Sequence, residues 1–156
     1  MFNIVLFNPQ IPPNTGNIGR LCVNAGASLH IVKPIGFDIS EKAVKRAGLD
    51  YWDNVDLKIW ESTEEFLNNI DTSRCFFATT KTNTPYFQKN YKPGDYLIFG
   101  SETKGIDENI LKRFKDQCIT IPMTKKGRSL NLAVSTGIIL YEAIRQNFQT
   151  FVDLNQ

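Results

Sequence analysis

The residues best suited to chemistry lie in one stretch, Ile121 to Glu142, where a polar loop joins a short apolar strand to a densely apolar helix. The loop carries three basic residues and one glycine between Thr124 and Arg128. Ser129 and Asn131 follow it, at the point where the apolar pattern of a buried helix begins. Both side chains can accept hydrogen bonds from the free N–H groups of a first helical turn. The position predicts either a helix cap or one wall of a ligand site, and residue type alone favours the cap.

The cysteine and histidine content argues against several other kinds of site. The three cysteines, Cys22, Cys75 and Cys118, are widely separated and lie in apolar segments. Their odd number and spacing fit neither a disulfide framework nor a metal site, so we expect small core residues and no metal. The single histidine, His30, lies in a run typical of a strand, which argues against a Ser-His-Asp or Cys-His hydrolase.

Segments typical of strands alternate with segments typical of helices along the chain, which predicts an α/β fold: a mostly parallel sheet with helices on both faces. The expected strands are Phe2–Phe7, Leu29–Val32, Leu57–Trp60, Cys75–Ala78, Tyr96–Phe99 and Ile119–Ile121. The expected helices are one capped by Asn14 or Thr15 and ended by Gly26, then Ser40–Ala47, Glu64–Ile70 after a Ser62/Glu65 capping box, Asp107–Phe114, and Leu130–Ile144. We expect one domain over residues 1–156, with residues 149–156 as a frayed tail.

Ligands of such folds gather beyond the carboxyl ends of the strands. Three expected strand exits are polar or small and could form one pocket: Ala78–Thr80, Gly100–Glu102 and the loop after Ile121. The chain contains neither G-x-x-x-x-G-K-[ST] nor G-x-G-x-x-G. The pattern therefore indicates an α/β nucleotide-type binder without the common phosphate-binding loops.

The composition is that of a globular protein, with 42% hydrophobic and 22% charged residues. No apolar run approaches the roughly 20 residues of a membrane span, and the first ten residues lack the basic region of a signal peptide. A cytoplasmic protein without a membrane partner is therefore expected. The net charge of +2 permits a nucleic-acid partner but does not argue for one.

Four segments, taken together and in this order, carry a family resemblance. They are NPQIPPNTGNIGRLC near the start, RAGLDYW (Arg46 to Trp52), LIFGSETKGI (Leu97 to Ile106) and IPM followed by RSLNLAVSTGIILYE. The chain resembles the SPOUT class of RNA 2′-O-methyltransferases, and within it the small tRNA (cytidine/uridine-2′-O)-methyltransferases of the wobble nucleotide, the TrmL group. The resemblance implies a deep C-terminal trefoil knot, S-adenosylmethionine as cofactor, tRNA as substrate, and a homodimer in which each active site is completed by the neighbour.

The resemblance also implies roles for individual residues. Arg20, in NTGNIGR, matches the catalytic arginine; because a guanidinium stays charged in proteins, gripping a phosphate and favouring a developing alkoxide suits it better than accepting a proton. The residues matched to the cofactor pocket are Ala78, Gly100, Ile121, Met123, Ser129 and Leu130, with Glu102 and Asn131 beside it. The residues matched to substrate binding are Asn14, Tyr141, Arg128 and Lys126.

The chain departs from the family pattern in one place: Ala133 and Val134 stand where a second Ser-Asn pair is common. With no room for a separate RNA-binding domain, RNA contacts are expected from basic residues of the catalytic domain, and Tyr51 or Trp52 could stack on an unpaired base. The basic candidates are Lys42, Lys45, Arg46, Lys125, Lys126 and Arg128. Three alternatives stay open: a methyltransferase of ribosomal RNA, an RNA-binding scaffold that holds the cofactor without turnover, and a small-molecule binder.

The last expected helix is apolar nearly all round, from Ile138 to Ile144. One part of this surface must face the sheet, and the rest is free to face a second subunit. The pattern of the helix therefore favours a dimer.

Overall fold

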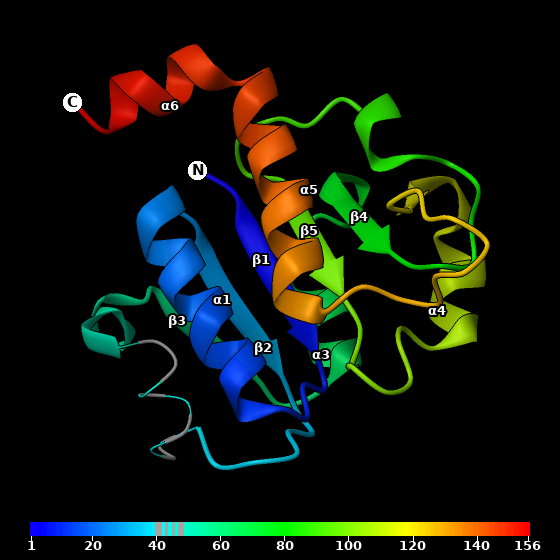
Figure 1. The fold of residues 1–156 in the computed structure, drawn as a ribbon, viewed down its shortest axis with the longest axis horizontal. Coiled ribbons are helices and arrows are strands. Elements are labelled where there is room, and N and C mark those ends of the chain that lie inside the picture. Colours follow the sequence, from blue (N-terminus) through cyan, green and yellow to red (C-terminus); the bar gives the residue numbers. More distant parts are fainter. Residues whose placement is uncertain (40–41, 43, 45, 47–48) are drawn as a thin grey trace.

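The computed structural model describes residues 1–39, 42, 44, 46 and 49–156. The helix expected over Ser40–Ala47 includes residues outside this part of the chain, and so does the candidate RNA contact Lys45. Strands and helices alternate in the described part (Figure 1). The strands are β1 (Asn3–Phe7), β2 (Ser28–Val32), β3 (Leu57–Trp60), β4 (Cys75–Ala78), β5 (Tyr96–Phe99) and β6 (Cys118–Ile119). The helices are α1 (Pro12–Ala25), α3 (Thr63–Asn68), α4 (Glu108–Arg113), α5 (Leu132–Gln146) and α6 (Phe148–Leu154), with a 3-10 turn η1 (Leu49–Asn54).

The described strands form one six-stranded sheet in the order β3-β2-β1-β5-β4-β6. Every neighbouring pair is parallel, so all the carboxyl ends lie along the same edge. The parallel sheet with helices on both faces, expected from the alternating pattern, is confirmed.

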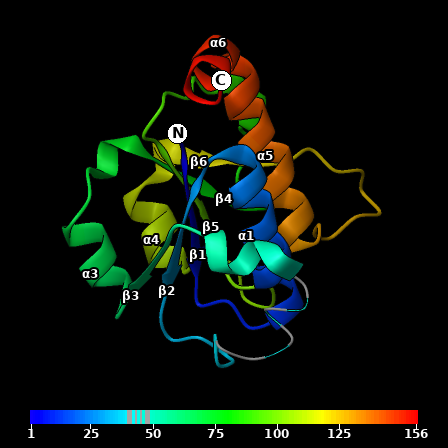
Figure 2. The same ribbon diagram turned by 90° about the vertical axis from the view of Figure 1, so that its left-hand side faces the viewer.

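Side chains that alternate along the central strands supply two separate cores. Ile4 and Leu6 of β1 face the layer of α1 and α5, whereas Val5 and Phe7 face α3 and α4. Because both faces are covered, these strands form nearly continuous apolar runs rather than alternating with polar residues at every second position. Figure 2 shows α1 and α5 on one side of the sheet and α3 and α4 on the other.

Several local signals have the expected outcome. The Ser62 hydroxyl accepts a hydrogen bond from the N–H of Glu65 at the start of α3, and Asp107 caps α4 through the N–H of Asn109. Gly26 ends α1 in the left-handed conformation at φ 63°, which favours glycine.

Two expected boundaries are wrong. Helix α1 begins at Pro12, so Asn14 and Thr15 lie inside its first turn instead of capping it. A proline with its fixed φ and missing N–H suits a first helical position, which explains the earlier start. Strand β6 ends at Ile119, and Thr120 then forms an isolated parallel bridge with Pro85 through bonds to Thr84 and Tyr86.

The C-terminal segment also differs from the frayed tail expected for residues 149–156. Residues Phe148–Leu154 form α6, and Phe151 packs against the core on the α1/α5 side of the sheet. Helix α6 also contacts α5, the helix that precedes it.

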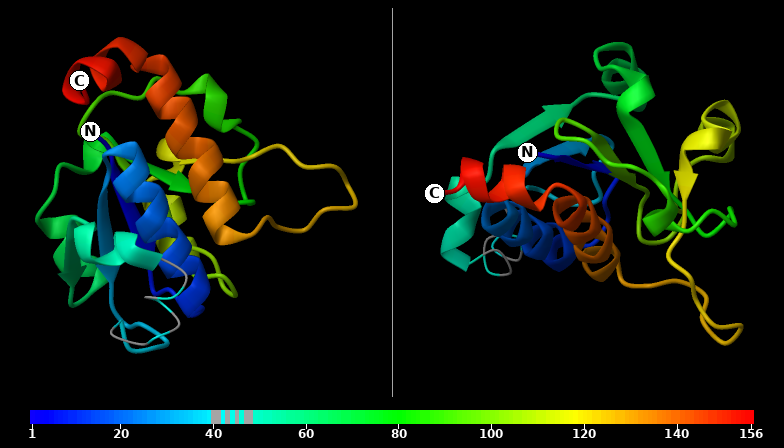
Figure 3. Two further views of the ribbon diagram at one scale, coloured as in Figure 1. Left: turned by 60° about the vertical axis from the view of Figure 1, so that its left-hand side comes forward. Right: turned by 90° about the horizontal axis from the view of Figure 1, so that it is seen from above.

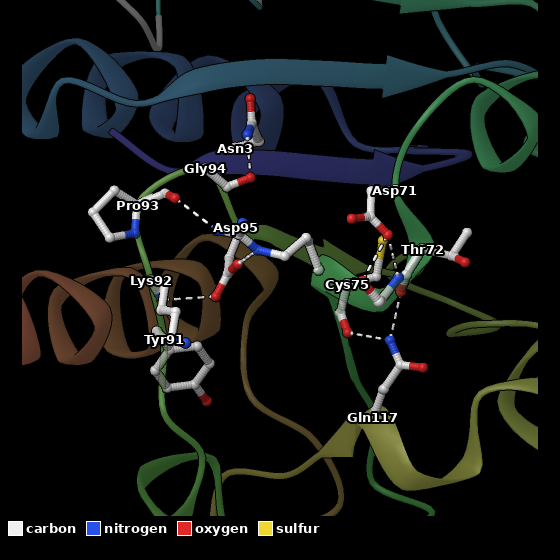
Figure 4. Close-up of polar contacts among 12 residues, drawn as sticks. Asn3, Asp71, Thr72, Cys75, Tyr91, Lys92, Pro93, Gly94, Asp95 and Gln117 are labelled. Atoms are coloured by element: carbon white, nitrogen blue, oxygen red, sulfur yellow. Dashed lines mark hydrogen bonds and ion pairs between the residues drawn. The ribbon is translucent and has the colours of Figure 1, made fainter.

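The amino ends of β4, β5 and β6 are tied together by polar contacts (Figure 4). The Asp95 carboxylate is 3% exposed and accepts hydrogen bonds from the Arg74 guanidinium and from the N–H of Lys92. The Gln117 amide donates to the carbonyls of Thr72 and Cys75. These contacts hold together the residues that directly precede β4, β5 and β6.

In the described part of the chain, no helix combines the length and apolar character that crossing a bilayer requires.

His30 lies inside β2 as expected and forms part of a buried aromatic cluster. Its Nε2 bonds to Asn3 Oδ1 at 3.0 Å, and its Nδ1 accepts from the Trp60 indole at 3.0 Å. Because an indole N–H can only donate, this geometry requires a neutral imidazole. Burial, reinforced by the nearby charge of Lys58 and opposed by Asp56, lowers the pKa of His30 from 6.5 to about 4.

This lowered pKa predicts a pH dependence of stability. Between pH 6.5 and pH 4 the unfolded chain binds more protons at His30 than the folded chain, so stability is full above this window and is lost as pH falls through it. We expect the melting temperature to decline by a few degrees between pH 7 and pH 5. His30→Gln, which can keep one donor and one acceptor, should flatten that slope. Equal slopes for the two proteins in thermal unfolding would contradict the assignment.

Candidate active site

A pocket of about 450 Å³ opens where β4, β5 and β6 end. Its walls come from the β4 exit, the β5 exit, the loop between β6 and α5, and the first turn of α1. The three polar exits predicted to converge therefore do so. The predicted site residues among its lining are Asn14, Ala78, Gly100, Glu102, Ile121, Met123, Ser129, Leu130 and Asn131.

The pocket also has lining residues that sequence reasoning missed. Lys104 lies on the β5 exit, and Ser135 and Ile139 come from α5. The spacing of Asn131, Ser135 and Ile139 is one helical turn per step, which is the signal that could have found the last two.

Gly100 permits the β5 exit to fold back on itself. A Cβ atom at Gly100 would lie 2.1 Å from the carbonyl carbon of Gly105 and 2.3 Å from the N of Ile106. Gly105 itself has a φ of 67°, and its N–H donates to the carbonyl of Ser101 at 3.0 Å. The tight turn leaves the backbone of Gly100 at the pocket wall, where a ligand can approach it closely.

Glu102 joins the β5 exit to the start of α1. One carboxylate oxygen accepts from the N–H of Gln10 at 2.9 Å, and the other accepts from the N–H of Ile11 at 2.7 Å and faces the Asn14 amide at 3.4 Å. Helix α1 has no side-chain cap on its own N-cap residue. The Glu102 carboxylate therefore supplies the negative charge that a helix N-terminus favours.

Asn131 extends this network to α5. Its amide nitrogen donates to Asn14 Oδ1 at 3.0 Å, while its Oδ1 accepts from the N–H of Val134 at 3.1 Å. Asn131 is thus both the cap of α5 and part of the pocket wall, so the two functions predicted for this position coexist. Ser129 lines the pocket without capping the helix.

The other predicted residues lie outside this pocket. Arg20 is on the exposed side of α1, with its Cζ atom 5.4 Å from the centre of the Tyr51 ring. Tyr141 is 46% exposed on α5. Arg128 lines a second, shallower hollow between residues 80–85 and 120–128, and Lys126 is exposed on the same loop, which projects from the body of the protein (Figure 3).

Thiol and metal chemistry find no support in the described part of the chain. Burial raises the pKa of Cys22 and of Cys75 to about 12, so neither thiol ionises near neutral pH. All three cysteines are buried and unpaired. The described residues contain no group of three or more histidine, cysteine, aspartate or glutamate side chains that could hold a metal ion.

The family of the chain is decided by comparison with known proteins. The profile of the SpoU rRNA methylase family matches residues 1–141. The chain belongs to the SpoU methylase family. A tRNA (cytidine(34)-2′-O)-methyltransferase of Yersinia pestis is 45% identical over 152 residues, which cover 94% of each chain.

Solved structures of SpoU methylases have the same fold. One, described as giving structural insights into the 2-OH methylation of C/U34 on tRNA, aligns with a TM-score of 0.91 at 41% identity and covers 96% of this chain and 97% of its own. An AdoMet-bound rRNA methyltransferase of Sinorhizobium meliloti aligns with a TM-score of 0.80 at 26% identity. That alignment covers 92% of this chain but only 56% of the other, longer one.

Substitution of Gly100 tests whether its close packing against Gly105 and Ile106 is needed to form the pocket wall. Gly100→Ala forces a methyl group into backbone atoms of Gly105 and Ile106, so the β5 exit must shift. We expect a loss of about 1–3 kcal/mol in the free energy of unfolding, measured by denaturant titration. Gly127→Ala is the matched control: its Cβ would meet neighbours at an ordinary 3.6 Å, and little change is expected. Equal stability of the two variants would refute the packing argument.

Proposed function

We propose that this chain transfers a methyl group from S-adenosylmethionine to the ribose 2′-hydroxyl of the wobble cytidine or uridine of tRNA. The observation that carries the proposal is the convergence of three separate strand exits, with all the residues matched to a cofactor site, on one pocket. Relatives named for this reaction cover nearly the full length of the chain. Such a protein acts in the cytoplasm, where tRNA is found.

The pocket suits the proposed cofactor chemically. Ile121 and Leu130 offer apolar surface for a purine ring, and backbone groups around Gly100 are accessible to its polar edge. A volume of about 450 Å³ lies in the range of small-molecule sites. When bound, S-adenosylmethionine supplies a methyl group already activated on a sulfonium. The protein therefore has mainly to align the attacking hydroxyl.

Arg20 is the residue proposed to act on the substrate. Its guanidinium can hold the phosphate next to the methylated ribose and stabilise the oxyanion that develops as the hydroxyl attacks. Asn14 lines the pocket, where it can position the ribose, and Tyr141, Lys126 and Arg128 are exposed enough to contact RNA. Among the other basic candidates, Lys42 and Arg46 are also exposed.

We also propose the C-terminal trefoil knot. Among its contacts with the later chain, the connection from β4 to β5 bonds to both ends of the last segment: Thr84 and Tyr86 bond to Thr120, and Tyr91 bonds to Gln146 and Asn147. The chain between these places forms the pocket loop and α5. This arrangement supports threading of the last segment through the β4–β5 connection, although knots are rare in proteins.

A homodimer is proposed on the face formed by α1 and α5, which lie side by side in Figures 1 and 2. Three large hydrophobic side chains are exposed there on or just before α5: Leu130 at 40%, Val134 at 52% and Tyr141 at 46%. Arg20 lies on the outer side of the adjacent helix, outside the pocket of its own subunit. A second copy on this face can bring one subunit's Arg20 to the other's pocket.

Ribosomal RNA is the second candidate substrate, because the matched family is described by rRNA methylation. The lengths favour tRNA: this chain spans 97% of the structure concerned with C/U34 but 56% of the rRNA methyltransferase. A scaffold that binds the cofactor without turnover is the remaining alternative, and the experiment below includes it.

The reaction is tested by incubating the protein with S-adenosylmethionine and either unmodified tRNA or ribosomal RNA, followed by nucleoside mass spectrometry. We expect 2′-O-methylcytidine or 2′-O-methyluridine at the wobble position of tRNA. Arg20→Ala should reduce turnover by at least about a hundredfold, as for loss of an oxyanion-stabilising group, and leave cofactor binding intact in calorimetry. Arg113→Ala, on α4 at the other face of the sheet, is the control and should keep full turnover. Methylation of ribosomal RNA alone, or binding without transfer, would reject the proposal.

The dimer is tested by charging the proposed interface. Val134→Lys places an ammonium on the exposed surface of the first turn of α5, so we expect sedimentation to shift from dimer to monomer and methyl transfer to fall with it. Ile59→Lys, at a similarly exposed position on the edge strand β3, should remain dimeric. A wild-type protein that sediments as a monomer at micromolar concentration would overturn the interface.

A further inference from the structure

One segment of the family resemblance runs from Arg46 to Trp52, and the residues of it that the structure describes do not line the pocket. Its last residues belong to η1, which packs against α1. Tyr51 is half-buried and Trp52 is 9% exposed, although the two are neighbours. The aromatic pair therefore has two different environments, which the stacking function predicted for it does not explain.

Trp52 fixes how η1 sits on α1. An added Cβ at Gly19 would lie 2.7 Å from Cζ3 and 2.8 Å from Cε3 of the Trp52 ring. Any side chain larger than hydrogen at position 19 would push the indole away. Gly19 is thus the site on α1 where η1 docks closely, and the contact sets the position of the next pair of residues.

That next pair is Arg20 and Tyr51. The guanidinium carbon of Arg20 lies 5.4 Å from the centre of the Tyr51 ring. This distance is within the roughly 6 Å at which a cation is attracted to the face of an aromatic ring. The order of residues on the two segments matches: Gly19 receives Trp52, and Arg20 meets Tyr51.

We propose that Tyr51 is a positioning residue that holds the Arg20 guanidinium against its ring and so presents it to the substrate phosphate. The inference rests on the proposed function of Arg20 in methyl transfer. An exposed arginine samples many rotamers, and fixing them costs entropy when the guanidinium stabilises the oxyanion that develops in the transition state. The ring limits these rotamers beforehand, while leaving the edge N–H groups of the guanidinium available for a phosphate.

The test distinguishes the contribution of the Tyr51 ring face from that of its hydroxyl group and from that of its side-chain volume. Tyr51→Leu keeps an apolar side chain but removes the π face, so kcat should fall about two- to fivefold, with the KM for tRNA and the affinity for S-adenosylmethionine unchanged. Tyr51→Phe keeps the face and should restore the wild-type kcat. Phe87→Leu makes the same aromatic-to-leucine change at a residue that is 48% exposed and should have no effect. Tyr51→Gln supplies a second non-aromatic variant, which must show the same loss even if the leucine variant folds poorly.

A direct readout does not depend on turnover. Arginine side-chain Nε–Hε relaxation by NMR should show a lower order parameter for Arg20 in Tyr51→Leu than in the wild type, and a wild-type value in Tyr51→Phe. Arg113, whose Cζ lies 5.0 Å from the Phe114 ring, is an internal reference that should not change.

Each other outcome overturns the proposal. An unchanged kcat and order parameter in Tyr51→Leu would show that the contact is incidental. An equal loss in Tyr51→Phe would assign the effect to the hydroxyl. A raised KM for tRNA with unaltered Arg20 dynamics would assign Tyr51 to base stacking. Failure of the wild type to transfer any methyl group would instead refute the proposed function, while the relaxation measurement would still decide the contact.

Discussion

The carboxylate of Glu102 occupies the N-terminus of α1, and this contact determines how the pocket is assembled. Two backbone N–H groups at the start of α1 donate to it from a distance of 91 and 92 residues along the chain. Hydrogen bonds to a charged group are stronger than those between neutral groups, and the helix dipole adds to them. Through Asn14 and Asn131 the same network reaches the cap of α5. A residue on the β5 exit thereby sets the spacing between two helices that begin at the pocket.

The turn at Gly100 and the network at Glu102 depend on each other. The β5 exit can bring Glu102 to α1 only if it doubles back within a few residues, and the contact with Gly105 leaves no room for a Cβ at Gly100. Backbone that would otherwise be covered by a side chain then forms the pocket wall. Tight packing therefore serves two purposes here, since it orders three loops and gives a ligand access to main-chain polar groups.

The parts of this structure that sequence predicts well are those set by neighbouring residues. The six strands, the caps at Ser62 and Asp107 and the end of α1 at Gly26 follow from short-range hydrogen bonds and apolar pattern. The convergence of the strand exits also follows, because parallel strands share one edge of the sheet. The partners of Glu102 and the docking of Trp52 on Gly19 do not, because each joins segments far apart in the chain. Arg20 is the instructive case: its motif is readable in the sequence, but its place outside the pocket is a property of the three-dimensional arrangement.

The position of Arg20 bears on the dimer proposed for the α1/α5 face. From Asn14 in the pocket wall to Arg20, α1 advances six residues, or about 9 Å at 1.5 Å per residue. The Arg20 guanidinium lies over the ring of Tyr51, and Arg20 is not among the residues that line the pocket. Geometry within one subunit thus separates the group proposed to hold the substrate from the group proposed to hold the cofactor. Pairing two such faces would resolve the separation, because each copy would bring its arginine to the other's pocket while burying the apolar side chains that α5 exposes. In that arrangement methyl transfer would depend on dimer formation. The exposed apolar side chains that hold the two copies together would then also determine where the substrate can bind.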